Sequence, residues 1–142
     1  MADVDAFEPP PGLVARIGSL LADPRAAWDA IAREEPESAP VMSYVWPLAC
    51  LMALAGFIGG WWATGFARQT ETLIVLGAMA LLGLAATILA VHAFAFAAKT
   101  LAPRFGAEAN GARALQLSGY SATGVLLAGV VQLMPGPAPP AV

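Results

Sequence analysis

Three long runs of uncharged residues dominate the pattern of apolar and polar positions along the chain. Residues 41–66 and residues 73–98 each give 26 consecutive positions without a formal charge, and residues 114–134 give 21. About 20 apolar residues in helical form cross the roughly 30 Å of hydrocarbon in a bilayer. The pattern therefore predicts three transmembrane helices. The third is the weakest by hydropathy, because it carries several polar residues: Gln116, Ser118, Tyr120, Ser121, Thr123 and Gln132.

The first 40 residues follow a shorter, amphipathic pattern. Apolar residues recur on one helical face within residues 12–22, at Leu13, Ile17, Leu20 and Leu21. Asp23 followed by Pro24 is typical of a helix N-cap and N1 position, and predicts a second short helix over residues 24–34. We expect this pair to lie at the cytoplasmic face of the membrane. The alternative is a helical segment folded against the soluble domain of another protein, since amphipathicity alone does not select the partner.

Composition supports this division of the chain. The 142 residues are 58% hydrophobic and 12% charged, whereas soluble domains are about 45–50% apolar and about 25% charged. We therefore predict an all-α integral membrane protein with three parts: a head over residues 1–40, a bundle over residues 41–135 and a Pro-rich tail over residues 136–142.

The basic residues predict an orientation. The head carries eight acidic and three basic residues, which leaves it at about −5. The positive-inside rule counts only Lys and Arg near the ends of the spans. The head and the second connector hold all but one of these residues: Arg16, Arg25, Arg33, Lys99, Arg104 and Arg113. The head and the second connector are therefore expected in the cytoplasm and the tail outside. The remaining one, Arg68, lies in the first connector.

Residues 99–113 are expected to form the cytoplasmic bend between the second and third spans, with Pro103, Gly106, Asn110 and Gly111 as helix breakers. Arg outnumbers Lys six to one and Ala, Gly and Pro abound, as in proteins from GC-rich bacterial genomes. We therefore expect a bacterial inner membrane.

Aromatic rings are expected to anchor the helices at the membrane surfaces, where amphipathic rings are favoured. The candidates flank the spans or lie in the head: Trp28, Tyr44, Trp46, Trp61, Trp62 and Tyr120.

Residues that could carry chemistry are scarce. His92 is the one ionisable candidate inside a span, and we expect it to be a packing or interfacial histidine bonded to a neighbour. A metal site would need further ligands, yet the spans add only Cys50. Ser118, Ser121 and Thr123 have no general base at a defined spacing. The sequence therefore predicts no enzyme, no metal and no cofactor.

Small residues recur at packing intervals in all three spans. Such positions allow helix backbones to approach closely in lipid, where the hydrophobic effect between helices is absent. The pairs are Gly56/Gly60, Gly83/Thr87, Gly119/Thr123 and Gly124/Ala128. They indicate packing either within the chain or against another chain. For the third span we expect the face bearing Gly124 and Ala128 to be held by neighbouring helices.

Two segments resemble a known family of membrane proteins. In the head, Leu21, Pro24 and Trp28 match a short helix, a turn and a Trp-containing helix. After the second span, matching positions are Ala102, Pro103, Phe105, Gly106, Tyr120, Ser121, Thr123 and Met134-Pro135. These motifs resemble bacterial members of the Yip family, the Ypt/Rab-interacting-protein domain. The resemblance implies a helical membrane bundle with a cytoplasmic N-terminus. Eukaryotic relatives act in vesicle traffic through small GTPases, a role that bacterial members need not share.

The chain departs from that family in two places. Gly124 stands where the family often has proline, and the sequence ends in PGPAPPAV where relatives continue into about two more spans. The resemblance therefore implies either a shortened member, with unmatched helix surfaces, or a sequence that is a fragment of a longer chain. We expect a scaffold or accessory subunit in contact with the lipid bilayer and with other integral membrane chains or further copies of itself, and no nucleic acid. An oligomeric channel or carrier for a small solute, with the polar residues of the third span along its path, is the alternative.

Overall fold

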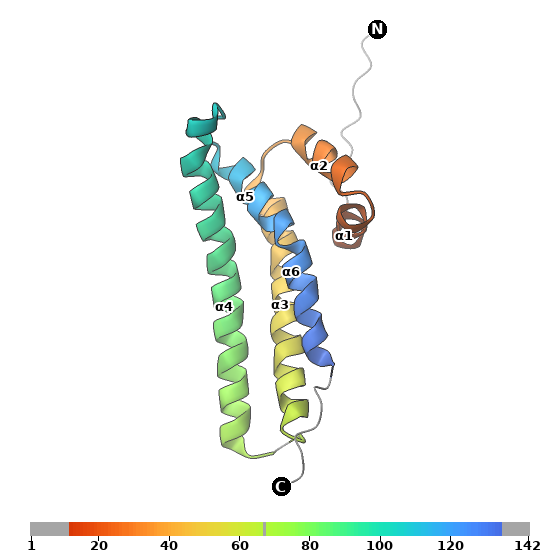
Figure 1. Cartoon of the computed structure of the whole chain (residues 1–142). Coiled ribbons are helices and arrows are strands. Elements are labelled where there is room, and N and C mark those ends of the chain that lie inside the picture. Colours follow the sequence, from red (N-terminus) through yellow and green to blue (C-terminus); the bar gives the residue numbers. More distant parts are fainter. Residues whose placement is uncertain (1–11, 67, 135–142) are drawn as a thin grey trace. The chain divides into compact units, whose positions relative to one another are not determined.

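The computed structural model describes residues 12–66 and 68–134, and the secondary structure of these residues is entirely helical (Figure 1). The described chain divides into two compact units, which meet in sequence between Glu35 and Pro36. The acidic start of the head, with Asp3, Asp5 and Glu8, lies outside the described residues, as does the predicted tail over residues 136–142.

Unit 1 contains two ten-residue helices, α1 (Leu13–Ala22) and α2 (Pro24–Arg33). Asp23 separates them and its side chain accepts a hydrogen bond from the backbone N–H of Ala26 (3.1 Å), so the predicted N-cap and N1 proline are confirmed. The predicted face of α1 is partly wrong, because Leu20 is buried but Leu21 is 61% exposed. Successive residues of an α-helix point about 100° apart, so Leu21 points away from the direction in which Leu20 is buried.

Arg16, expected only as a topology charge, has a structural partner in unit 1. Its side chain is buried and its guanidinium forms an ion pair with the carboxylate of Glu34, at the end of α2. A buried charge is tolerated only when it is paired and hydrogen-bonded. The pair therefore joins the start of α1 to the end of α2.

Unit 2 begins with the first span, α3 (Ser38–Ala63), which is displaced by three residues at both ends from the predicted 41–66. It begins earlier because Pro40 fits the first turn of a helix. Pro47 lies inside this helix, and because it has no N–H it removes one backbone hydrogen bond there. The helix ends at Ala63 because Gly65 (φ 65°) and Phe66 (φ 57°) adopt left-handed backbone.

The second span is longer than predicted. α4 (Thr70–Leu101) contains 32 residues and continues as a short 3-10 helix, η1 (Ala102–Phe105). At 1.5 Å per residue, α4 is about 48 Å long and exceeds the roughly 30 Å hydrocarbon core. The predicted bend over 99–113 therefore shrinks to residues 106–110. Gly106 (φ 74°) ends η1, and Asn110 caps the next helix by accepting from the N–H of Arg113 (3.0 Å).

The third span is broken, which the sequence pattern did not predict. It consists of α5 (Gly111–Ser121), α6 (Thr123–Ala128) and a 3-10 segment, η2 (Gly129–Leu133). The break at Ala122 coincides with a hydrogen bond from the Thr123 hydroxyl to the carbonyl oxygen of Tyr120 (2.6 Å). A side chain that bonds the preceding turn in this way competes with the helical ladder.

The break redirects the third span. α5 packs against both α3 and α4, whereas α6 and η2 pack against α3 (Figure 1). α3 is consequently the central helix of unit 2, and it contributes half of the buried hydrophobic residues described there: Val41, Tyr44, Val45, Leu48, Ala49 and Ala55. α4 has little buried surface, with Val91 and Ala95 its buried residues. The three helices long and apolar enough to cross a membrane are Ser38–Ala63, Thr70–Phe105 and Gly111–Leu133, so the predicted three-span, all-helical fold is confirmed for the described residues.

Candidate functional site

A buried polar cluster joins the first and third spans. The Tyr44 hydroxyl lies 2.7 Å from Oγ1 of Thr123, and Tyr44 and Tyr120 meet edge to face with centroids 5.1 Å apart. The single hydroxyl proton of Thr123 is donated to the Tyr120 carbonyl, so the Tyr44 hydroxyl must be the donor to Thr123. This chain of hydrogen bonds fixes the rotation of α6 relative to α3 at the helix break.

This cluster changes the role expected for two aromatic residues. Tyr44 and Tyr120 were expected at the membrane surface, but they are 5% and 4% exposed. Rings so deeply buried offer almost no surface to lipid headgroups, and they act as packing residues of unit 2. Trp46 and Trp62 are about half exposed, and their position at the membrane surface stays a prediction.

The polar residues of α5 also bond within unit 2. Gln116 is buried and its side-chain oxygen accepts from Nη1 of Arg113 (3.0 Å). The Ser118 hydroxyl donates to the backbone carbonyl of Val91 in α4 (2.7 Å). The Ser118 bond therefore joins α5 to α4, whereas the bond between Arg113 and Gln116 lies within α5 itself.

Several of the predicted small residues allow close packing inside unit 2. A methyl group at Gly60 would lie 2.7 Å from Cδ2 of Leu76 in α4, and one at Gly56 would lie 3.1 Å from Oε1 of Gln132 in η2. At Gly119, a methyl group would lie 2.5 Å from Cγ1 of Val41. These distances are shorter than normal van der Waals contact, so a Cβ at any of the three positions would require the neighbouring side chain to move.

Two further packing glycines were missed. A Cβ at Gly59 would overlap the backbone carbonyl of Gln132, and one at Gly129 would overlap the side chain of Met52. Gly59 adjoins Gly60, so a pattern that seeks small residues four apart selects Gly56 and Gly60 and passes over it. The cluster of three glycines within residues 56–60 was the sequence feature that could have indicated a close helix contact at Gly59.

Comparison with known protein families gives one match. The model of the Yip1 domain matches residues 17–140, which is most of the chain. The chain belongs to the Yip1-domain family. No significant match was found among curated proteins or solved structures. The family, like the three apolar helices, indicates a multi-pass membrane protein, and it is not known as an enzyme family.

The family motifs in this Yip1 domain have clear structural positions. Ala102, Pro103 and Phe105 lie in η1, and Gly106 provides the left-handed turn after it. Tyr120 and Thr123 lie on either side of the helix break and carry the buried polar cluster. The family motif of the third span therefore coincides with the residues that bend it.

Three of the predicted small residues have no close neighbour in the Yip1 domain. A methyl group at Gly83 or at Gly124 would meet nothing within 4 Å, and Ala128, one turn after Gly124, is exposed. Thr87 donates its hydroxyl to the Gly83 carbonyl within α4 (2.8 Å). The face bearing Gly124 and Ala128 is therefore not used for packing inside the chain, where the neighbouring face with Thr123 and Leu126 is buried instead.

His92 is exposed on α4, and its Nδ1 lies 2.8 Å from the backbone carbonyl of Ile88. Within the described ranges, no group of three or more His, Cys, Asp or Glu residues is arranged to hold a metal ion. Cys50 is a free, exposed cysteine.

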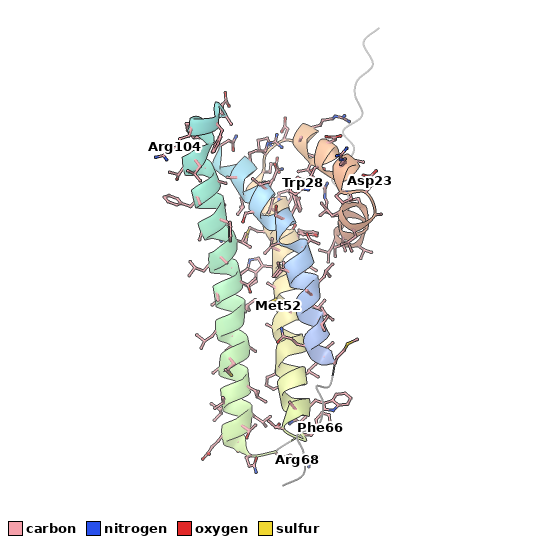
Figure 2. All side chains as sticks on the ribbon, in the orientation of Figure 1. Asp23, Trp28, Met52, Phe66, Arg68 and Arg104 are labelled. Atoms are coloured by element: carbon pink, nitrogen blue, oxygen red, sulfur yellow. The ribbon has the colours of Figure 1, made fainter. Side chains whose placement is uncertain are left out.

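The basic residues expected to set topology are spread over both units. Arg25 and Arg33 are exposed in unit 1. In unit 2, Lys99 lies in the last turn of α4, Arg104 lies in η1 and Arg113 lies in the first turn of α5, so all three are at one end of the unit. Figure 2 shows Arg104 at that end and Arg68, beside Phe66, at the other.

Proposed function

We propose that this Yip1-domain protein is a non-enzymatic subunit of the bacterial inner membrane that packs against other membrane chains, either different proteins or further copies of itself. The observation that carries the proposal is the contrast among its glycines. Gly56, Gly59, Gly60, Gly119 and Gly129 are occupied by neighbours inside unit 2, whereas the Gly124/Ala128 face is open.

An open face of small residues suits a partner helix better than lipid. In a bilayer, helices associate through close backbone approach and van der Waals packing at small residues. Large apolar side chains are the usual residues toward lipid, and α4 presents many of them: Ile74, Val75, Met79, Leu81, Leu82, Leu89, Phe94 and Phe96. α6 places Gly124 and Ala128 on its open side, beside Val125, its one large exposed apolar side chain.

Cross-linking through this face tests the proposal. In a Cys50→Ser background, Ala128→Cys should give a product heavier than one chain when native membranes are treated with a short thiol cross-linker. Leu82→Cys, at a large exposed residue of α4, is the matched control and should give little. Equal yields from the two cysteines, or none from Ala128→Cys, would contradict the proposed face.

We also propose that the head and the α4–α5 connector face the cytoplasm. This orientation is supported by the positive-inside rule, because Lys99, Arg104 and Arg113 lie at one end of unit 2 and Arg68 alone lies at the other. Unit 1, with its apolar face and net negative charge, would then lie at the cytoplasmic surface through apolar burial rather than through attraction to anionic lipid.

Thiol labelling of intact cells measures this orientation. In the Cys50→Ser background, Asn110→Cys should be protected from an impermeant reagent, and Ala138→Cys should be labelled. Permeabilised cells provide the control, since both cysteines should then react. Labelling of Asn110→Cys in intact cells would reverse the proposed orientation.

A further inference from the structure

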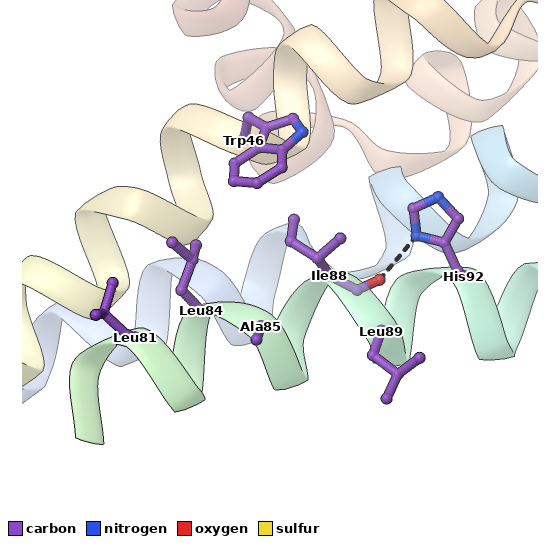
Figure 3. Close-up of a pocket in the computed structure, with 7 residues that line it drawn as sticks. All are labelled: Trp46, Leu81, Leu84, Ala85, Ile88, Leu89 and His92. Atoms are coloured by element: carbon purple, nitrogen blue, oxygen red, sulfur yellow. Dashed lines mark hydrogen bonds between the residues drawn. The ribbon is translucent and has the colours of Figure 1, made fainter. Parts of the chain in front are cut away.

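An open groove runs along the pair formed by α3 and α4. Its larger hollow, of about 410 Å³, is lined by Trp46, Leu81, Leu84, Ala85, Ile88, Leu89 and His92 (Figure 3). A second hollow, of about 290 Å³, shares Leu81 and Leu84 with the first and continues past Ala53, Leu54, Phe57, Gly77 and Ala80. The two hollows therefore form one elongated apolar groove with polar groups at one end only.

The polar end has a donor and an acceptor. A backbone carbonyl can only accept, so His92 Nδ1–H donates to Ile88, and in the neutral ring Nε2 is then an acceptor. Trp46 is 46% exposed, and Figure 3 shows the nitrogen edge of its indole turned toward the His92 end of the groove. The indole N–H is a donor only. Among the residues that the structure describes, neither Trp46 Nε1 nor His92 Nε2 has a hydrogen-bond partner.

The two groups lie at similar depth in the membrane. Trp46 is eight residues after the start of α3, and His92 is nine residues before the end of α4. At 1.5 Å per residue, both are roughly 12–14 Å from the helix ends on that side of unit 2. α4 is about 18 Å longer than the hydrocarbon is thick, so about 9 Å of helix extends beyond the hydrocarbon at each end when the excess is shared equally. His92, about 14 Å from the end of α4, then lies roughly 5 Å inside the hydrocarbon boundary. Polar groups at this depth favour a hydrogen-bonding partner, because little water is available.

We propose that the groove binds a neutral, membrane-dissolved amphiphile whose polar end is a hydroxyl group, of which diacylglycerol is the type. The hydroxyl donates to His92 Nε2 and accepts from Trp46 Nε1–H, and one acyl chain lies along the groove toward Gly77. A hydroxyl group has both functions in one atom. A phospholipid phosphodiester carries a charge and offers only acceptors, so it fails to satisfy His92 and would have to lose its hydration.

Competition between two matched ligands tests this site. The whole protein, in phosphatidylcholine liposomes, is labelled with a diacylglycerol that carries a photoreactive group on one acyl chain, and the labelled residues are mapped by mass spectrometry. Unlabelled diacylglycerol should compete about 3- to 15-fold better than its 3-O-methyl ether, which can still accept from Trp46 but cannot donate to His92, as expected for the loss of one hydrogen bond in a membrane. Labelling should map to residues of α3 and α4 that line the groove.

Variants separate the site from general lipid contact. His92→Leu should abolish the preference for the hydroxyl over the methyl ether, and Trp46→Phe should reduce affinity for both ligands. Thr100→Val is the matched control, because Thr100 also bonds the carbonyl four residues earlier in α4 (2.8 Å) but lies outside the groove. It should leave the preference unchanged. These residues are exposed, so the fold should persist in each variant.

Three results would overturn the proposal. Equal competition by the two ligands would show contact with bulk lipid only. An undiminished preference in His92→Leu would place the hydroxyl elsewhere. Exclusion of both ligands, with cross-linking between copies through Ala85→Cys in a Cys50→Ser background, would show that a second copy fills the groove.

Discussion

Replacing Gly59 with alanine should destabilise the packing of the third span on the first, whereas the same change at Gly83 should not. A Cβ at Gly59 would overlap the backbone carbonyl of Gln132 in η2, so a rigid segment rather than a flexible side chain has to move. Overpacking of this kind costs about 1–3 kcal/mol. Gly83 is also inside a membrane helix, but a Cβ there meets nothing within 4 Å, and alanine favours a helix over glycine by up to about 1 kcal/mol.

The measurement is the loss of helical signal as the purified protein is titrated from mild detergent into sodium dodecyl sulfate. Gly59→Ala should unfold at lower denaturing detergent than the wild type, and Gly83→Ala at the same level or higher. The glycine-to-alanine change is identical in the two variants, so the difference isolates the contact with Gln132. If the two variants unfold together, η2 does not pack on α3 as described.

Replacing Gly124 with leucine should separate folding of the chain from its association with partners. A side chain at Gly124 points into open space, so unit 2 should keep its stability in detergent. The close approach of another helix would be blocked, and at about 1–3 kcal/mol for overpacking the partner should bind roughly 5- to 150-fold more weakly. Ser121→Ala, an exposed and nearly isosteric change on α5, is the control and should bind normally.

Co-purification from membranes reads out this effect. Gly124→Leu should accumulate in the membrane and lose its partner chains, and Ser121→Ala should retain them. If both variants retain the same partners, the open face of α6 is not a packing face. If Gly124→Leu instead unfolds at a lower concentration of sodium dodecyl sulfate than the wild type, the open face stabilises the fold of the chain itself.

The number, order and approximate limits of the spans follow from the sequence because hydrocarbon thickness imposes a length on any apolar run. Helix ends do not follow in the same way. The first span begins three residues early because Pro40 suits a first helical turn, and α4 runs past Lys99 because a charge at the end of a span need not end a helix. The hydropathy of the sequence indicates where a helix leaves the hydrocarbon. The helix itself ends where its backbone hydrogen bonds end, which can be several residues further on.

Whether a small or polar residue faces a neighbouring helix or the outside depends on how the helices pack, which the sequence pattern does not give. Gly56, Gly60, Gly119 and Gly124 look alike in sequence, yet the first three meet a neighbour and the last does not. The break at Ala122 decides this, because it turns α6 so that Thr123 and Leu126 are buried and Gly124 faces outward. The hydrogen bond between Tyr44 and Thr123, beside the break, joins residues 79 positions apart and leaves no local pattern.

The mass of the particle in native membrane most directly tests whether this Yip1-domain protein is a subunit of a larger assembly. The protein is extracted with its surrounding lipid into polymer nanodiscs, without detergent, and weighed by native mass spectrometry after release. The account predicts a mass above that of the 14.5 kDa chain, with the excess lost in Gly124→Leu. A stable, monodisperse particle containing a single copy and no other protein would contradict it.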